Sequence, residues 1–371
     1  MYFKMYSNKK KFTRKAALFA ALVGISLCGG FAFAADTIVF GDQYGREIKL
    51  DKPAQRIVTV PIPAASMVMA LDGTDEHLVG MNPSAKRALL EGVLGKFFPN
   101  SAHINSDIVM GEGFAPNVET LLTLAPDIVF QWGDRGDDIV KPIEAAKLNM
   151  ALLKYGTQED LETWIGMFGA ALGKTERAGK ILDWHRSERA QLEKAVAAIP
   201  QDKRPKILYL YRYGDSIQIG GQNSYFDYFI KMVGGVNPAE NSPSESQINE
   251  EQLLTWDPDI LLLNGFQSAL APDDVYANAN LAGVKAVKNR HVYKMPLGGY
   301  RWDPPNQESP LMWKWLAMLA HPDTFEWDLR SDIVEAYRFL YNQEPTQEDL
   351  DGILRLPMNA TAANYSKFLG K

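Results

Sequence analysis

The order of hydrophobic and polar positions predicts short strands and helices that follow one another along most of the chain. Residues 38–40 and 47–50 flank a Gly-Asp-Gln-Tyr-Gly-Arg turn, and together they predict a β-hairpin. An apolar run at 56–60 predicts a buried strand, and the helical pattern that follows ends at Gly73. Further apolar runs, separated by helical or loop segments, predict strands at 79–81, 128–130 and 151–153. This alternation is typical of a lobe built on a parallel sheet.

A long helical pattern then divides the chain. It contains no proline until Pro200, and beyond it the alternation of strands and helices restarts. The last fifty residues, from Pro322, have a helical pattern with a polar, poorly periodic end. The sequence therefore predicts an α/β protein with two Rossmann-like lobes, mainly parallel sheets and a ligand cleft between the lobes. The predicted parts are an N-terminal lobe at 35–157, one linking helix at 158–198, a C-terminal lobe at 199–321 and a helical extension at 322–371.

The most informative pattern is an internal repeat of twelve residues. The segment 117–128 recurs 132 residues later as 249–260, with eight identical positions. Each copy has an Asn that can cap a helix, a Glu in the first turn where the helix dipole favours it, and a Pro-Asp pair before a strand. The repeat predicts two similar lobes that present Glu119 and Glu251 at equivalent positions. These carboxylates can simply stabilise their helices, or they can dock both lobes on a partner with basic pockets.

The first 34 residues have the pattern of an export signal. A basic stretch ends at Lys15, an apolar stretch at 16–27 is too short to span a bilayer, and Ala32-Phe33-Ala34 forms a cleavage pattern. We expect cleavage after Ala34 and a periplasmic mature chain. Cys28, the single cysteine, offers the alternative of a lipoprotein, but Leu27 stands where lipid attachment requires a small residue.

Charge limits the kinds of partner. The signal holds 6 of the 39 basic residues and no acidic ones, which leaves 33 basic against 45 acidic residues, a net charge of −12. This balance argues against nucleic acid and anionic membranes as partners. A local pair of arginines can still hold a small anion in one cleft.

Catalytic and metal-binding motifs are missing from the sequence. The five histidines are scattered without metal-ligand spacing, and no thiol lies beyond the predicted signal. The segment 169–175 resembles a phosphate-binding loop, but it is one residue short and lies in a helical pattern, so we expect its glycines to pack helices. Neither a serine nucleophile motif nor a zinc-protease motif is present. We therefore predict no enzyme activity, no cofactor and no protein-bound metal.

Three clusters of arginine and aromatic residues stand at predicted strand ends or in loops. Open α/β sheets bind ligands beyond the carboxyl ends of their strands, which is where these clusters are expected. Arginine binds carboxylate, catecholate or oxyanion oxygens, and aromatic rings cover conjugated ligand faces. The alternative is that each cluster is interface packing. The candidate residues are Trp132, Arg135, Tyr211, Arg212, Tyr300, Arg301 and Trp302.

At this point the chain resembles the periplasmic substrate-binding proteins of ABC importers for ferric siderophores, haem and cobalamin, whose two α/β lobes are joined by one rigid helix. The resemblance covers the mature chain to about His321. It is carried jointly by several short motifs, each weak alone. They are the Asp-Gln-Tyr-Gly-Arg-Glu run at 42–47, Pro-Ala-Gln-Arg-Ile-Val at 53–58, Leu-Val-Gly at 78–80, both Glu-x-Leu-Leu repeats, Gly-Gly-Val-Asn at 234–237, and Val-Tyr at 292–293 before the Pro296 loop.

The resemblance implies roles for individual residues. Glu119 and Glu251 match the family glutamates that meet arginines of the membrane permease. Trp132 falls where the cobalamin-binding relatives have a ligand-contacting tryptophan, and the loop at 300–302 falls where several relatives contact ligand. The remaining candidates are placed only by neighbourhood and chemistry. The extension at 322–371 passes the point where the shorter relatives end, and no function is assigned to it.

The sequence thus predicts a monomeric solute receptor of an ABC importer. It captures a metal complex, first of all a ferric siderophore, with haem or cobalamin as alternatives, and delivers it to transmembrane permease subunits that work with a cytoplasmic ATPase. The mixture of arginine and aromatic residues leaves the ligand open, because some relatives bind bare molybdate or tungstate. For an oxyanion, Arg301 and backbone N–H groups near residues 61–66 would serve. A periplasmic enzyme and a sensor that feeds another membrane protein are the other functional classes.

Overall fold

Four parallel strands form the sheet of the first lobe. The computed structural model describes residues 37–111 and 113–370, so the predicted export signal and Cys28 lie outside the described residues. The strand order is β4-β3-β5-β6. The strands are β3 (Ile57–Thr59), β4 (Leu78–Met81), β5 (Ile128–Trp132) and β6 (Met150–Leu153). The residues of β3, β5 and β6 are all buried, as expected of a parallel sheet covered on both faces.

Helices and a hairpin complete this lobe. The predicted hairpin is present as antiparallel β1 (Ile38–Gly41) and β2 (Glu47–Leu50), and the predicted helix that stops at Gly73 is α1 (Ala64–Asp72). The other helices are α2 (Pro83–Glu91), α3 (Leu94–Phe97), η1 (Pro99–His103), α4 (Val118–Leu124) and α5 (Asp137–Ala145).

The second lobe has a five-stranded sheet with the order β11-β10-β7-β8-β9. Strands β7 (Ile207–Arg212), β10 (Ile260–Leu263) and β11 (Val292–Lys294) are parallel, as predicted. Strands β8 (Ile217–Gly220) and β9 (Glu245–Ile248) are antiparallel additions that the sequence pattern does not reveal. The edge strand β9 reads Glu-Ser-Gln-Ile with alternating exposure, so it lacks the apolar run by which buried strands are recognised.

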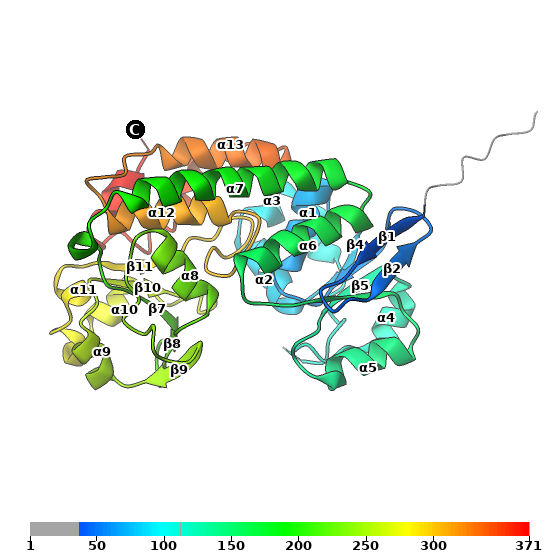
Figure 1. Ribbon diagram of the computed structural model, residues 1–371, viewed down its shortest axis with the longest axis horizontal. Coiled ribbons are helices and arrows are strands. Elements are labelled where there is room, and N and C mark those ends of the chain that lie inside the picture. Colours follow the sequence, from blue (N-terminus) through cyan, green and yellow to red (C-terminus); the bar gives the residue numbers. More distant parts are fainter. Residues whose placement is uncertain (1–36, 112, 371) are drawn as a thin grey trace, which may run out of the picture. The chain divides into compact units, whose positions relative to one another are not determined.

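The segment between the sheets differs from the prediction of one helix over 158–198. It forms two helices, α6 (Gln158–Ala171) and α7 (Thr175–Ala197), which pack against each other. Gly173 separates them with a φ of 68°, a left-handed conformation that favours glycine and ends a helix. Gly169 lies against Ala178 of the next helix, where an added Cβ would be 2.5 Å from the alanine Cβ, so it is a packing glycine as expected. Along the chain the lobes are therefore linked by one helix, α7, the long helix in Figure 1.

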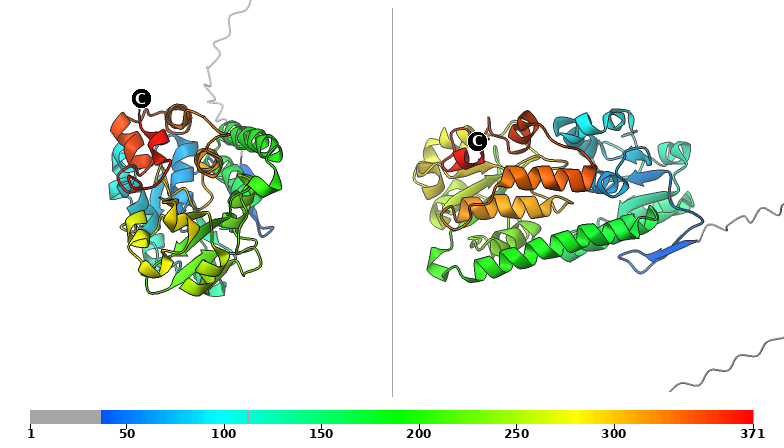
Figure 2. Two further views of the ribbon diagram at one scale, coloured as in Figure 1. Left: turned by 90° about the vertical axis from the view of Figure 1, so that its left-hand side faces the viewer. Right: turned by 90° about the horizontal axis from the view of Figure 1, so that it is seen from above.

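The remaining helices of the second lobe and the extension complete the chain. Those of the lobe are η2 (Gln201–Lys203), α8 (Tyr225–Met232), α9 (Glu250–Trp256), α10 (Pro272–Tyr276), η3 (Ala279–Leu281), α11 (Lys285–Lys288) and α12 (Ser309–Ala320). The predicted helical extension contains α13 (Leu329–Tyr341), α14 (Gln347–Ile353) and η4 (Tyr365–Phe368). Helix α12 packs against both α7 and α13 (Figure 2). No helix among the described residues is long and apolar enough to cross a membrane.

The extension contacts both lobes. On the first lobe, Lys96 Nζ lies 2.7 Å from an Asp349 carboxylate oxygen, and the rings of Phe97 and Tyr337 meet edge to face with centroids 6.1 Å apart. On the second lobe, the backbone N–H of Leu297 donates to the carbonyl of Ile353 at 2.9 Å. The extension is therefore a brace between the lobes rather than a tail.

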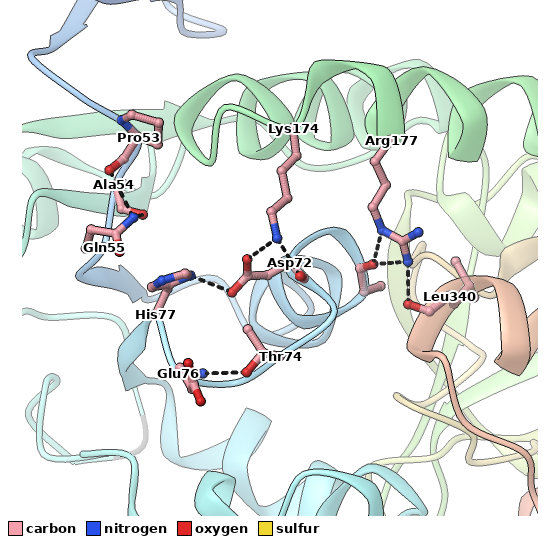
Figure 3. Close-up of polar contacts among 11 residues, drawn as sticks. Pro53, Ala54, Gln55, Asp72, Thr74, Glu76, His77, Lys174, Arg177 and Leu340 are labelled. Atoms are coloured by element: carbon pink, nitrogen blue, oxygen red, sulfur yellow. Dashed lines mark hydrogen bonds and ion pairs between the residues drawn. The ribbon is translucent and has the colours of Figure 1, made fainter. Parts of the chain in front are cut away.

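A polar cluster at the start of α7 strengthens this brace (Figure 3). Lys174 Nζ donates to the carboxylate and the carbonyl of buried Asp72, both at 2.6 Å, and His77 Nδ1 lies 2.8 Å from the same carboxylate. Arg177 donates to the carbonyls of Ala70 at 2.7 Å and Leu340 at 2.7 Å. These carbonyls end α1 and α13, where backbone acceptors lack partners within the helix and a cation is favourable.

Candidate ligand-binding site

The predicted clusters lie at the carboxyl ends of parallel strands. Trp132 is the last residue of β5, Arg212 is the last residue of β7, and the loop at 300–302 follows β11. Two aromatic residues that the sequence analysis did not select also stand after strands: Tyr155 follows β6 and Phe266 follows β10. Extending the strand-end rule to every strand would have found both of them.

In the first lobe, Trp132 is the centre of an aromatic group. It is only 2% exposed, and its ring meets those of Phe114, Tyr155 and Trp164 edge to face, with centroids 5.4 to 6.2 Å apart. Arg135 is exposed, and its Cζ lies 4.8 Å from the centroid of Phe114 and 5.1 Å from that of Trp132. The aromatic faces hold the guanidinium in place by a cation–π interaction. Its N–H groups have no hydrogen-bond partner among the described residues, so they can bind an anion.

In the second lobe, the ring of Phe266 packs against two arginines, as the rings of Phe114 and Trp132 pack against Arg135 in the first lobe. Arg212 Cζ lies 5.2 Å from the ring centroid of Tyr211 and 6.0 Å from that of Phe266. Arg301 Cζ lies 4.9 Å from the Phe266 centroid. Arg301 is 2% exposed, and its Nε donates to the carbonyl of Gly265 at 2.9 Å, whereas Arg212 is half-buried. Two arginines therefore lie against one aromatic ring.

The two lobes are in contact at Arg301. Arg301 Nη1 donates across the lobes to the carbonyl of Ser84, in α2, at 3.4 Å. Burial raises the pKa of Tyr211, and the positive charges of Arg212 and, from the other lobe, of Arg135 act in the opposite direction. Burial also raises the pKa of Tyr155, with smaller contributions from Asp303 and Tyr211 of the other lobe. Six of the seven predicted ligand-binding residues therefore lie in this region, which we call the interlobe site: Trp132, Arg135, Tyr211, Arg212, Tyr300 and Arg301.

Trp302 lies in a different environment. It is fully buried, and its Nε1 donates to Glu308 Oε2 at 2.7 Å. The same carboxylate accepts hydrogen bonds from Tyr337 Oη and from the backbone N–H of Gly299. Burial raises the pKa of Glu308, and these donors oppose that effect. Trp302 thus ties its loop, through Glu308, to Tyr337 of the extension, and its predicted role in ligand binding stays a prediction.

The predicted docking glutamates have matching local geometry. Glu119 and Glu251 are both exposed second residues of seven-residue helices, α4 and α9. Asn117 and Asn249 cap these helices by accepting from the backbone N–H groups of Thr120 and Gln252. Both helices end at a residue in the left-handed conformation, with φ values of 42° and 46°. The sequence repeat is therefore also a repeat of structure.

The described residues hold no group of three or more His, Cys, Asp or Glu side chains that could bind a metal ion. The interlobe site instead provides cations, phenols and aromatic faces. Such a set suits a ligand that brings its own negative charge and, where a metal is present, its own metal ligands.

Known proteins with similar sequences are named as binding proteins. A family model described as "Periplasmic binding protein" matches residues 72–297. The Fe(3+)-citrate-binding protein YfmC of Bacillus subtilis is 24% identical over 78% of this chain and 90% of its own length. The molybdate-binding protein MolA of Haemophilus influenzae is 24% identical over 84% of this chain and 92% of its own.

Solved structures of periplasmic binding proteins match the fold of this chain. The periplasmic solute binding protein of Veillonella parvula is 35% identical, with a TM-score of 0.79 over 88% of this chain and 99% of that one. The molybdate-bound structure of Haemophilus influenzae MolA matches with a TM-score of 0.73 at 20% identity, over 83% of this chain and 99% of that one. The predicted two-lobe α/β fold and the predicted class of protein are confirmed. This chain belongs to the periplasmic binding protein family.

Proposed function

We propose that this protein is the solute-binding component of an ABC importer and that it captures an anionic metal complex, with a ferric siderophore as the expected cargo. The observation that carries this proposal is the pair Arg135 and Arg212. They come from different lobes, each is stacked on aromatic rings, and each has accessible surface. A ligand held between them would meet positive charge on both sides and aromatic surface beneath each charge.

The relatives support this class of ligand. Besides YfmC, the iron(3+)-hydroxamate-binding protein FhuD of Bacillus subtilis is 28% identical over 54% of this chain, and a haem uptake protein of Staphylococcus aureus, IsdE, is 25% identical over 62%. A binding role without catalysis fits a family named for binding, and it fits a site of arginines and aromatic rings. Product formation from a bound chelate in the absence of a permease would point to an enzyme instead.

The proposal is tested by isothermal titration of ferric citrate and ferric hydroxamates into the wild type and the variant R135A/R212A. We expect one site in the wild type and affinity lower by more than about 100-fold in the variant, because each lost charged hydrogen bond costs roughly 1.5–3 kcal/mol. R290A is the matched control, since Arg290 is also stacked on an aromatic ring, with its Cζ 4.0 Å from the centroid of Tyr276. Equal affinities in all three proteins would overturn the assignment.

A second candidate ligand is a molybdate or tungstate ion. The observation in its favour is the near-complete burial of Arg301 and Tyr300, at 2% and 1% exposure, because a deep arginine with little surrounding surface suits a small oxyanion. Titration with molybdate distinguishes this candidate. Tight binding of molybdate that is lost in R301A but kept in R135A/R212A would favour the oxyanion.

We further propose that the loaded protein docks on permease subunits through Glu119 and Glu251, and that the ATPase lies on the cytoplasmic side. The duplicated geometry of α4 and α9 supports this proposal, because a partner made of two similar subunits can bind one glutamate with each. We also propose that the chain is cleaved after Ala34 and that the mature protein is a monomer. A pull-down that recovers another membrane protein and no permease subunits would favour the sensor role.

A further inference from the structure

Three buried polar atoms at or beside the interlobe site lack a partner among the described residues. They are Trp132 Nε1 of the first lobe and Tyr300 Oη and Asp303 Oδ1 of the second, and their residues are 2%, 1% and 0% exposed. The ring of Tyr155 lies 5.7 Å from that of Trp132, and Gly265 holds Asp303 next to Arg301. Buried polar atoms without partners are rare and unfavourable, so unpaired atoms beside a binding site point to partners that the ligand brings.

The other oxygen of Asp303 is already used within the protein. Oδ2 accepts from Tyr209 Oη at 2.6 Å and from the backbone N–H of Gly265 at 3.0 Å. These two bonds fix the carboxylate, so Oδ1 has a defined position and direction. Because a carboxylate oxygen without a proton only accepts hydrogen bonds, its missing partner must be a donor.

Gly265 places this acceptor beside the buried arginine. Its N–H binds Asp303 and its carbonyl accepts from Arg301 Nε. The absence of a side chain is required here, because a Cβ on Gly265 would lie 2.7 Å from Asp303 Oδ1 and 3.1 Å from Arg301 Cβ. The backbone of one residue thus holds a cationic donor and an anionic acceptor next to each other.

We infer that Asp303 Oδ1 accepts a hydrogen bond from the bound solute, so that the solute carries at least one hydroxyl or N–H donor in addition to the anionic oxygens that the arginines bind. This inference rests on the proposed function and specifies the ligand of the same site. An organic chelate with free hydroxyl or amide groups satisfies both requirements. A bare tetrahedral oxyanion offers only acceptor oxygens, which would face the carboxylate without a proton between them.

The variant D303N tests this inference with little change in shape. The amide oxygen can keep the bonds to Tyr209 and Gly265, while the amide nitrogen replaces Oδ1 and turns the free acceptor into a donor. D227N is the matched control, because Asp227 is a buried carboxylate of the same lobe whose oxygens are used by Asn237 and Lys231. Thermal unfolding shows whether each variant is folded.

The probes are ferric citrate, a ferric trihydroxamate with amide N–H groups, the same trihydroxamate with these groups methylated, and molybdate, all measured by isothermal titration. We expect the wild type to bind a donor-bearing chelate and D303N to bind it about tenfold or more weakly, with D227N unchanged. If D303N does not fold, the N-methylated chelate tests the same hydrogen bond on the wild type, with the same loss expected.

The outcomes are distinct. Equal affinity of wild type and D303N for the chelate, or of the wild type for the chelate with and without N–H groups, would overturn the inference while leaving the binding function in place. Binding of molybdate alone would also overturn it. Failure of the wild type to bind any of the four probes would count against the proposed function itself.

Discussion

Glu119 and Glu251 lie 132 positions apart in the chain and occupy the same place in two copies of one short helix, each exposed and each two residues after a capping asparagine. An exposed acidic residue in a first turn stabilises its helix only modestly, by roughly 0.3–1 kcal/mol. The repeat of the whole unit, with its cap, its left-handed end and its following strand, indicates a role that needs both copies together.

Transport should therefore depend on these two carboxylates. We expect E119A/E251A to abolish solute uptake in cells that hold the cognate permease, because the receptor would lose its charged contact on each lobe. Affinity for the solute should be unchanged, since neither residue belongs to the interlobe site. The control is E348A, because Glu348 is an exposed second residue of the capped helix α14. Normal uptake by the double variant would refute the docking role.

The lobes should move little when solute binds. Helix α7 crosses between them without a break, and the extension ties them a second time through Lys96–Asp349 and Phe97–Tyr337. A continuous helix has no hinge residue that can absorb a large change in backbone angles. We expect the radius of gyration from small-angle X-ray scattering to change by less than about 1 Å with ligand. A large compaction would show that the brace opens.

The extension should be required for stability. Tyr337 of α13 is fully buried. It contacts Phe97 of the first lobe and Glu308, which accepts hydrogen bonds from the loop at 298–302. We expect Y337A to lower the free energy of unfolding by about 3–5 kcal/mol, the range for truncating a large buried aromatic side chain. The exposed Leu369 of the same extension provides the control, L369A, for which we expect a change below about 0.5 kcal/mol in urea unfolding.

Stability should also fall in acid because of His185. This fully buried ring, between Gln158 and Gln307, lies 3.0 Å through Nε2 from the Gln307 carbonyl and 3.3 Å through Nδ1 from Gln158 Nε2, an arrangement that suits the neutral ring. Burial lowers its pKa from 6.5 to about 4. Between these values the unfolded chain binds more protons than the folded one, so the stabilisation is complete above pH 6.5 and is lost as the pH falls toward 4.

The free energy of unfolding should fall by about 3 kcal/mol as the pH falls from 6.5 to 4. The measurement is urea unfolding from pH 7 to pH 4, with H185Q as the comparison. Glutamine does not titrate in this range and can donate to the same carbonyl, so its unfolding free energy should change less steeply with pH. Parallel pH profiles of wild type and H185Q would show that His185 does not cause the acid sensitivity.

Much of the architecture could be predicted from the sequence because it rests on local signals. The buried parallel strands are apolar runs, and α1 ends at the glycine that the pattern indicated. The break at Gly173 was missed because one glycine in a helical pattern does not by itself distinguish a packing position from a turn. Strand β9 was missed because it is a polar edge strand.

The binding site could be predicted only in part. The rule that ligands bind beyond the ends of strands located Trp132, Arg135 and Arg212, because the end of a strand can be read from the local sequence. It did not show that Trp302 turns toward Glu308, because the buried partner that attracts it is set by how α12 and α13 pack. Nor could it show that Asp303 keeps one oxygen without a partner among the described residues, which depends on Tyr209 of β7 and on Gly265, just after β10.

The central claim is that the interlobe site captures a ferric chelate, and the most direct test uses the tryptophans of the unaltered protein. Trp132 lies beside Arg135 at this site, so a bound ferric complex should quench its fluorescence. Titration of the mature chain with ferric siderophores should give saturable quenching at one equivalent, and the iron-free chelators should give little. The absence of saturable quenching by any ferric complex, together with a saturable response to molybdate, would contradict the account.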